Sequence, residues 1–202
     1  MKLYIIRHGE TDWNAKKWLQ GGSETTLNEN GRKLAILTGQ ALQEVQFHKV
    51  YSSPLKRAME TARLVIGNRD IEIIPEPRIR EISFGIYEGK SYHPDHMEVP
   101  KEMIDAFFHH PEDYPVPEQG ESIDEIIART HDFYKALVQD KTLADANILI
   151  SAHGCAVRAL EQSLDTSKGF WREGVPKNCA VTIAEIVNGE VVSVAWDQIF
   201  YE

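Results

Sequence analysis

Two arginines and two histidines lie where predicted buried strands end, and their side chains are suited to phosphate chemistry. Arg7 and His8 follow the apolar run "LYII", and His153 follows "ILISA". Arg57 lies in the first turn of a helix predicted after "KVYSS". The carboxyl ends of strands in an open parallel sheet meet at one crevice, and guanidinium groups bind phosphate through planar forks of donors. The pattern therefore predicts a site for a phosphoryl group.

His8 is predicted to act as the nucleophile at this site. Surrounding positive charge lowers the pKa of a histidine, so the neutral imidazole keeps a lone pair, and its attack on phosphorus would form a phosphohistidine. A protonated His153 would stabilise charge on the phosphoryl oxygens. The departing alkoxide needs a proton. The segment "RIREISFGIYEG" offers Glu81 as the donor, with Glu88 as the alternative.

Strands and helices alternate along the chain, and this order must position the site residues. A final pair of strands over 180–187 and 190–196 is typical of a hairpin with a type I′ turn at Asn188-Gly189. We expect one domain over residues 1–202, folded as a three-layer α/β/α sandwich. Its central sheet is expected to be mostly parallel with one antiparallel strand. Buried strands that precede the hairpin are predicted over 2–6, 48–53, 71–75 and 147–152.

Sequence signals mark where the helices begin and end. Thr26 and Glu29 have the spacing of a capping box, which predicts a helix to about residue 45. Ser53 is the expected N-cap of the next helix, which would end at Gly67. A further helix is predicted over 155–164, directly after the strand that ends at His153.

The segment 85–120 interrupts this alternation and is rich in proline, histidine and aromatic residues. We interpret it as an inserted lid over the active face, with a short helix over 100–109. Ser122 and Glu125 form a capping box for a long helix to about Leu137. Two readings of the nearby aromatic residues stay open, a substrate-pocket lining or packing within the lid or core. These residues are Trp13, Trp18, Phe107 and Phe108.

Composition narrows the class of partner. The net charge is −9 at pH 7 and no basic stripe offsets it, so we expect no nucleic-acid partner. No apolar run approaches the roughly 18 residues that span a bilayer, and the start of the chain lacks the features of a signal peptide. We therefore expect a cytoplasmic protein without membrane contact. Cys155 and Cys179 are too few and too far apart for a disulfide framework or a cysteine-built zinc site.

Four blocks of the sequence resemble the histidine phosphatase, or phosphoglycerate mutase-like, superfamily. They are "LYIIRHGETDWN", "YSSPLKRAMETA", "EISFGIYEG" and "ISAHGCAVR", and they occur in the family order across nearly the whole chain. The resemblance implies an α/β/α sandwich and catalysis through a phosphohistidine without metal or cofactor. It implies His8 as nucleophile, Glu81 as proton donor and a small phosphorylated metabolite as substrate. The residues that match the phosphate and substrate pocket are Arg7, Asn14, Gln20, Gly21, Arg57, His153 and Gly154.

The third block favours the phosphatase branch over the mutases. Mutases of the family carry an Arg-His-Tyr run after the catalytic glutamate and, further on, an arginine pair for the substrate carboxylate. Here Glu81 is followed by Ile-Ser-Phe, and no arginine occurs between residues 81 and 128. The expected function is a metal-independent phosphatase. A phosphoglycerate mutase, a non-catalytic phospho-ligand binder and a metal hydrolase with His8, His153 and Glu81 as ligands are the alternatives, and the sequence does not indicate an oligomeric state.

Overall fold

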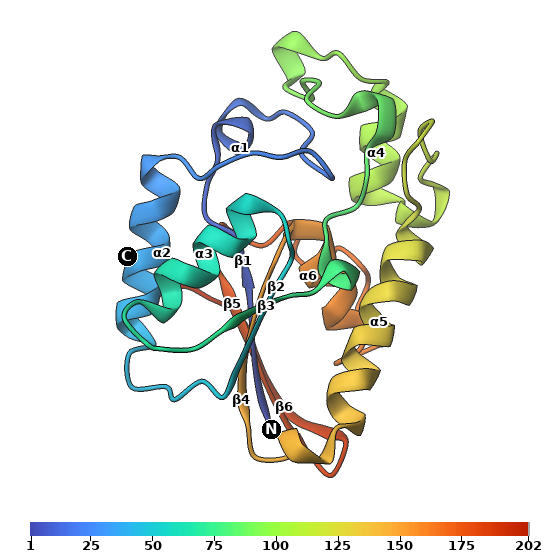
Figure 1. Cartoon of the computed structure of the whole chain (residues 1–202). Coiled ribbons are helices and arrows are strands. Elements are labelled where there is room, and N and C mark those ends of the chain that lie inside the picture. Colours follow the sequence, from blue (N-terminus) through green and yellow to red (C-terminus); the bar gives the residue numbers. More distant parts are fainter. Residues whose placement is uncertain (202) are drawn as a thin grey trace.

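The computed structural model describes residues 1–201, and its centre is a six-stranded sheet in the order β3-β2-β4-β1-β5-β6 (Figure 1). β5 runs antiparallel to both of its neighbours, and the other neighbouring strands pair in parallel. The predicted sheet with one antiparallel strand is therefore confirmed. The strands are β1 (Lys2–Arg7), β2 (Lys49–Ser52), β3 (Ile73–Pro75), β4 (Asn147–Ala152), β5 (Val181–Val187) and β6 (Glu190–Gln198).

The register of the central strands places the two predicted histidines side by side. Arg7 of β1 lies opposite Ala152 of β4 in a parallel pair, so the next residue on each strand is a histidine. The backbone N–H of His8 donates to the carbonyl of Ala152 at 2.9 Å. The two histidines therefore lie at neighbouring strand ends, as predicted from the sequence.

Helices cover both faces of the sheet, which confirms the three-layer sandwich (Figure 1). α2 (Glu29–Ala41) and α3 (Lys56–Ile66) pack on one face over a core that includes Tyr4, Ile6 and Val50. α5 (Ile123–Gln139) and α6 (Gly154–Gln162) pack on the other face over a core that includes Leu3 and Ile5. Alternate residues of β1 thus enter opposite cores, as the period of a strand requires.

Two predicted helix starts are wrong. α2 begins after Asn28, whose side-chain oxygen accepts from the N–H of Gly31 at 2.8 Å, and not at Thr26. α3 begins after Leu55, which has no side-chain cap. The Ser53 hydroxyl lies 2.7 Å from Nε2 of His153 and accepts from the N–H of Leu55 at 3.4 Å, before the helix begins. The capping box of Ser122 and the hairpin turn at 188–189, with positive φ at both positions, are confirmed.

The segment 85–120 lies with α1 (Asp12–Lys16) beyond the carboxyl ends of β1, β2 and β4 (Figure 1). It contains α4 (Lys101–His109), whose Met103 and Phe107 are buried, and several single 3₁₀ turns. An isolated bridge between Phe84 and Gly120 joins the two ends of the segment. In the described part of the chain, no helix combines the length and apolarity needed to cross a membrane.

Candidate active site

The rings of His8 and His153 face each other beyond the ends of β1 and β4. Their centroids are 5.1 Å apart with an interplanar angle of 61°, and both side chains are buried. Nδ1 of His8 lies 2.7 Å from the carbonyl oxygen of Gly9, which requires a proton on Nδ1. Nε2 of His8 therefore carries the lone pair that a nucleophile needs.

Both histidines are neutral in the free protein. Burial, followed by the charges of Arg57 and Arg7, holds the pKa of His8 well below its usual range. The pKa of His153 is lowered well below its usual range by burial and then by Arg57. The first result agrees with the predicted nucleophile. The second differs from the protonated His153 expected from the sequence, because burial and two guanidinium groups disfavour a further cation there.

Ser53 fixes the orientation of the His153 ring. Its hydroxyl lies 2.7 Å from Nε2 of His153. When Ser53 donates this hydrogen bond, the proton of the neutral ring resides on Nδ1. That nitrogen is buried and has no hydrogen-bond partner within residues 1–201. A neutral His153 can thus offer an N–H donor without carrying a charge.

Arg7 and Arg57 each leave the same side-chain atom, Nε, without a hydrogen-bond partner in the described structure. Arg57 is fully buried and donates to the carbonyls of Gly21 and Ser23, each at 2.7 Å. Arg7 donates through NH1 to the carbonyl of Pro176 at 2.5 Å. The Nε atoms of both arginines are buried without a partner in the described structure. Burial lowers the pKa of Arg57 to about 10, so its guanidinium stays charged at neutral pH.

Burial of these unpaired donors costs free energy, and their presence indicates an anionic ligand. A buried polar group without a partner costs about 1–3 kcal/mol, and a charged group costs more. Here the Nε–H groups of two guanidiniums and Nδ1 of His153 are buried without a partner, and the charges of both arginines act on His8. A phosphoryl group offers three acceptor oxygens with charge opposite to that of the arginines. The residues present therefore fit phosphate binding chemically.

The carboxyl group of Glu81 lies beside the first turn of α6. Its Oε2 accepts from the backbone N–H of Cys155 and its Oε1 from that of Ala156, both at 3.1 Å, and Oε1 also accepts from Ile82. Burial raises the pKa of Glu81 in spite of these hydrogen bonds and the nearby charge of Arg57. A raised pKa favours the protonated carboxyl group, which a proton donor needs.

Glu88, the alternative donor, occupies a different environment. Its carboxylate accepts from four backbone N–H groups and closes the turn after Gln20. These hydrogen bonds hold the loop after Gln20, and Glu88, unlike Glu81, does not line the cavity described below. The geometry therefore favours Glu81 over Glu88 as a proton donor. The four donors to Glu88 are the N–H groups of Gly21, Gly22, Ser23 and Phe84.

The remaining residues predicted for the pocket contribute in different ways. The side-chain oxygens of Asn14 and Gln20 accept hydrogen bonds from Thr11, which leaves their NH₂ groups as donors for a ligand. Gly21 contributes its carbonyl to Arg57 and does not line the cavity. At Gly154, a Cβ would lie 2.8 Å from Val175 and 3.6 Å from Glu81, so only glycine leaves this approach open.

A cavity of about 70 Å³ lies between this cluster and the 85–120 segment. Its lining includes Arg7, Asn14, Gln20, Glu81 and Gly154, whereas His8, His153 and Arg57 are buried and do not line it. The rest of the wall is mainly aromatic, with Trp18, Phe84, Tyr92, Phe107, Phe108 and Trp171. Trp18, Phe107 and Phe108 therefore line the pocket, whereas Trp13 packs against Trp18 outside it.

The sequence comparisons identify the family of the chain. A family model of the histidine phosphatase superfamily (branch 1) matches residues 3–199. The chain belongs to this superfamily. This histidine phosphatase superfamily member is 33% identical over 168 residues to fructose-2,6-bisphosphatase TIGAR B of Danio rerio. The match covers 81% of the chain and 60% of that protein. It is 31% identical to a 2,3-bisphosphoglycerate-dependent phosphoglycerate mutase of Bartonella tribocorum, covering 83% and 82% of the two chains.

A solved structure extends the likeness over the whole chain. Bacillus stearothermophilus YhfR superimposes with a TM-score of 0.89 and 31% identity, covering 100% of this chain and 99% of that one. The relatives of this histidine phosphatase superfamily member thus carry both phosphatase and mutase names. The comparisons establish the superfamily and the fold, and the choice between the two activities depends on the site.

Some contacts of this superfamily member could not be found from residue types. The carbonyl of Pro176 holds Arg7, and Asn178 donates to the carbonyl of His8 at 3.0 Å. Both come from the segment between α6 and β5, which carries no motif in the sequence. Ser53 could have been considered from its place in the second block, but the capping interpretation concealed its contact with His153.

Cysteine and metal alternatives receive no geometric support in the described residues. Cys155 is buried in the first turn of α6, and burial raises the pKa of its thiol well above the usual range, which makes it a poor nucleophile. Within residues 1–201, no three or more histidine, cysteine, aspartate or glutamate side chains are grouped as metal ligands. His8, His153 and Glu81 therefore do not form the ligand set of a metal hydrolase.

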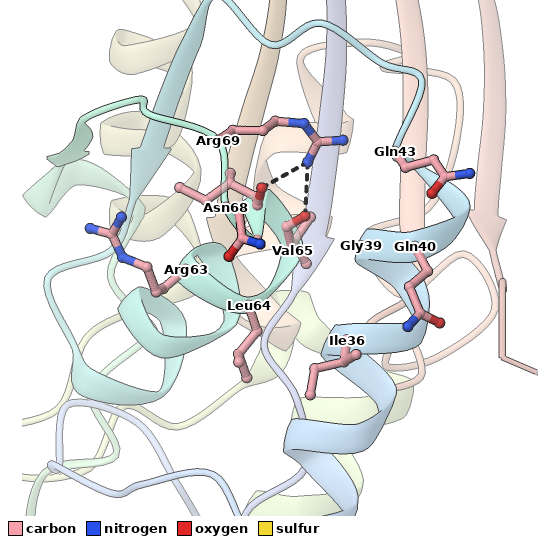
Figure 2. A pocket seen from close by; sticks show the side chains of 11 residues that line it. Ile36, Gly39, Gln40, Gln43, Arg63, Leu64, Val65, Asn68 and Arg69 are labelled. Carbon is pink, nitrogen blue, oxygen red and sulfur yellow. Dashed lines mark hydrogen bonds between the residues drawn. The ribbon is translucent and has the colours of Figure 1, made fainter.

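A larger groove lies between α2 and α3, and it holds none of the predicted site residues (Figure 2). Its volume is about 830 Å³, and Ile36 and Leu64 lie on its apolar part. Arg69 donates across its end to the carbonyls of Val65 and Ile66, so this arginine completes the last turn of α3. The groove lacks the convergent unpaired donors found around His8.

Proposed function

We propose that this protein is a metal-independent phosphatase that hydrolyses a small soluble phosphomonoester through a phosphohistidine on His8. The observation that carries the proposal is the set of unpaired buried donors on Arg7, Arg57 and His153 around a neutral histidine. A non-catalytic binder would need the donors but not the free Nε2 of His8 or a buried carboxyl with a raised pKa. We propose the cytoplasm as its place of action.

The reaction would proceed in two displacements. In the first, Nε2 of His8 attacks phosphorus while the bond to the leaving oxygen breaks, and protonated Glu81 gives its proton to that oxygen. In the second, water attacks the phosphohistidine, Glu81 takes a proton from the water, and inorganic phosphate leaves with His8 restored. Arg7, Arg57 and the Nδ1–H of His153 would hold the phosphoryl oxygens in both steps.

The cavity wall supports phosphatase over mutase activity. A mutase must hold the carboxylate of phosphoglycerate as well as its phosphate, and carboxylates are bound by cations. Arg7 is the one arginine or lysine that lines the cavity in the described structure, and its place beside Glu81 suits the phosphoryl group. Mutase activity is the second candidate, because a relative of Bartonella tribocorum with 31% identity carries that name.

Parallel assays separate the two activities. Release of inorganic phosphate from 4-nitrophenyl phosphate and 3-phosphoglycerate would be compared with interconversion of 2- and 3-phosphoglycerate primed by 2,3-bisphosphoglycerate. We expect phosphate release to exceed interconversion by orders of magnitude. Brisk primed interconversion would establish the mutase, and the absence of both reactions together with tight phosphate binding would indicate a binding protein. A screen of phosphorylated metabolites would then name the substrate.

A further inference from the structure

The segment between α6 and β5 supports the first catalytic strand from outside the sheet. NH1 of Arg7 donates to the carbonyl of Pro176, which is the one hydrogen bond of that side chain in the described structure. Asn178 donates to the carbonyl of His8, and the N–H of Cys179 donates to the carbonyl of Arg7 at 3.0 Å. The direction of the Arg7 guanidinium therefore depends on where this irregular segment is held.

A buried ion network anchors the segment two residues before Pro176. Nε of Arg158, from α6, donates to the carbonyl of Gly174 at 2.8 Å. The other nitrogens of Arg158 bind Glu161 at 2.6 Å and both carboxylate oxygens of Asp197 at 2.9 and 3.1 Å. The Arg158 side chain is 1% exposed. Its donors are thus divided between a charge network on one side and one backbone carbonyl on the other.

The network also holds the segment through Arg172. Its NH2 lies 2.9 Å from Asp197 and 3.3 Å from Glu161, and its guanidinium lies 4.4 Å from the ring centre of Trp196. Thr182 donates to the remaining oxygen of Glu161 at 2.5 Å. Two cations meet two anions, so the buried cluster is neutral and its carboxylates are fully hydrogen-bonded. Such a network rigidifies the elements that it joins.

Val175 connects this anchor with the catalytic end of α6. It lies between Gly174, which Arg158 holds, and Pro176, which holds Arg7. Its side chain packs so close to Gly154 that an added Cβ there would lie 2.8 Å away. A shift of Gly174 would therefore move both the wall beside Glu81 and the acceptor of Arg7.

We propose that Arg158 is a positioning residue, which sets the Arg7 guanidinium for phosphate by holding Gly174 and, through it, the carbonyl of Pro176. The proposal rests on the proposed function only in taking Arg7 as a phosphate ligand. Arg158 makes no contact with the cavity, and it acts through three consecutive residues of the segment, 174–176. A guanidinium is required, because a lysine can pair with the carboxylates but offers no second donor group in a fixed direction.

The test is a double-mutant cycle that measures the binding of inorganic phosphate by calorimetry. Arg158→Lys should weaken phosphate binding by about tenfold, as expected when a charge-assisted hydrogen bond is misaligned. In an Arg7→Ala background the same substitution should have no further effect. A general structural defect would instead weaken binding in both backgrounds. Equal effects in the two backgrounds, or unchanged binding in Arg158→Lys, would overturn the proposal.

Two further variants keep the outcome interpretable. Gly174→Ala places a Cβ where no atom lies within 4 Å, but at φ +80°, so it strains the segment and leaves the ion network intact. It should weaken phosphate binding in the wild-type background alone, even if Arg158→Lys does not fold. Val65→Ala, in the core on the opposite face of the sheet, should lower the Tm without changing phosphate affinity.

Different experimental results would refute the proposed function and this inference. If the wild-type protein does not bind phosphate, or if Arg7→Ala binds it equally well, the assignment of the phosphate site is wrong. If both behave as expected and Arg158→Lys and Gly174→Ala bind phosphate like the wild-type protein, only the positioning role is refuted.

Discussion

The carboxylate of Glu81 accepts a hydrogen bond from the backbone N–H of Cys155 at 3.1 Å, two residues after His153. The first turn of α6 thus fixes the carboxyl group relative to the strand end that carries the second histidine. The N–H donors favour the carboxylate and burial favours the neutral acid, and burial prevails. A group balanced in this way can give a proton in one step and accept one in the next.

The first prediction concerns Glu81→Gln. This variant should slow phosphorylation of His8 by alkyl phosphates by about 10²–10⁴-fold, because an alkoxide needs a proton to leave. Phosphorylation by 4-nitrophenyl phosphate should be much less affected, since nitrophenolate is stable as an anion. Single-turnover kinetics must be used, because Glu81 is also proposed to act in the second step. Equal losses for both substrates would show that Glu81 positions the substrate but does not donate.

Glu88→Gln is the matched control for this experiment. It replaces a carboxylate that accepts from the N–H groups of Gly21, Gly22 and Phe84, so it should mainly lower the Tm. We expect no dependence on the leaving group. If Glu88→Gln shows that dependence and Glu81→Gln is nearly silent, the proton donor has been assigned to the wrong carboxylate.

The second prediction is that the phosphoryl group is trapped on His8 during turnover. Phosphoramidates of histidine are labile to acid and stable to base, so rapid quenching in alkali should preserve the label. His8→Ala should lose the label and nearly all activity, because it removes Nε2, the proposed acceptor of the phosphoryl group. Peptide mapping identifies the position. An acid-stable label, or label on Cys155, would contradict the mechanism.

The third prediction concerns the donor on His153. His153→Ala should reduce kcat by about 10²–10³-fold, the usual loss when one donor to the developing charge is removed. Ser53→Ala should produce a smaller loss of the same kind, because the hydroxyl of Ser53 selects the nitrogen that carries the proton. Steady-state kinetics of both variants provide the comparison. A variant of His153 with wild-type kcat would exclude this role.

The fourth prediction links the two histidines to stability. The pKa values of His8 and His153 are lowered in the folded protein by burial first, so below pH 6.5 the unfolded chain binds protons that the folded chain does not. The free energy of unfolding should therefore fall as pH decreases below 6.5, by up to about 1.4 kcal/mol per pH unit for each histidine. Above pH 6.5 both groups are neutral in either state and contribute no slope.

Urea unfolding at pH 7.5 and pH 5.5 measures this effect. His8→Gln should lose one histidine's share of the pH dependence, and excess inorganic phosphate should reduce the dependence of the wild-type protein by favouring the protonated rings. An identical slope in wild type and His8→Gln would refute the burial-based account.

The fifth prediction is that turnover survives removal of divalent metals. The arginines repel a cation from the site, and the two displacements proposed for His8 require no Lewis acid. Activity on 4-nitrophenyl phosphate after dialysis against EDTA should equal that of the untreated enzyme. Loss of activity that returns with one divalent ion would replace the phosphohistidine mechanism with a metal-dependent one.

The sequence predicts the parts of the site that follow from strand direction. Arg7, His8 and His153 end two parallel strands, and the register of such strands is fixed by their buried faces, so their proximity could be foreseen. Ser53 was misassigned because a serine before a proline suits a helix cap as well as it suits a hydrogen bond to a histidine. Local pattern does not distinguish these two uses.

The backbone carbonyls that accept hydrogen bonds in the site could not be predicted from local sequence pattern either. The carbonyl of Pro176 that holds Arg7 has no sequence signature, since every residue has a carbonyl. The placement of Glu81 at the start of α6 depends on how the segment after β3 packs, where Arg129 of α5 donates to the carbonyl of Arg80. That contact joins residues far apart in the chain and follows from tertiary packing alone.

The strand order has a consequence for how this protein opens. β1 and β4, which carry Arg7 and lead to His153, are the two innermost strands, so their amides can exchange hydrogen with solvent only when the whole sheet comes apart. We expect the 85–120 segment, built from short turns and one helix of nine residues, to open at a lower free energy than the sheet. Amide hydrogen exchange should therefore be slow in β1 and β4 and fast in the 85–120 segment. Mild denaturant should alter substrate preference before it abolishes phosphoryl transfer.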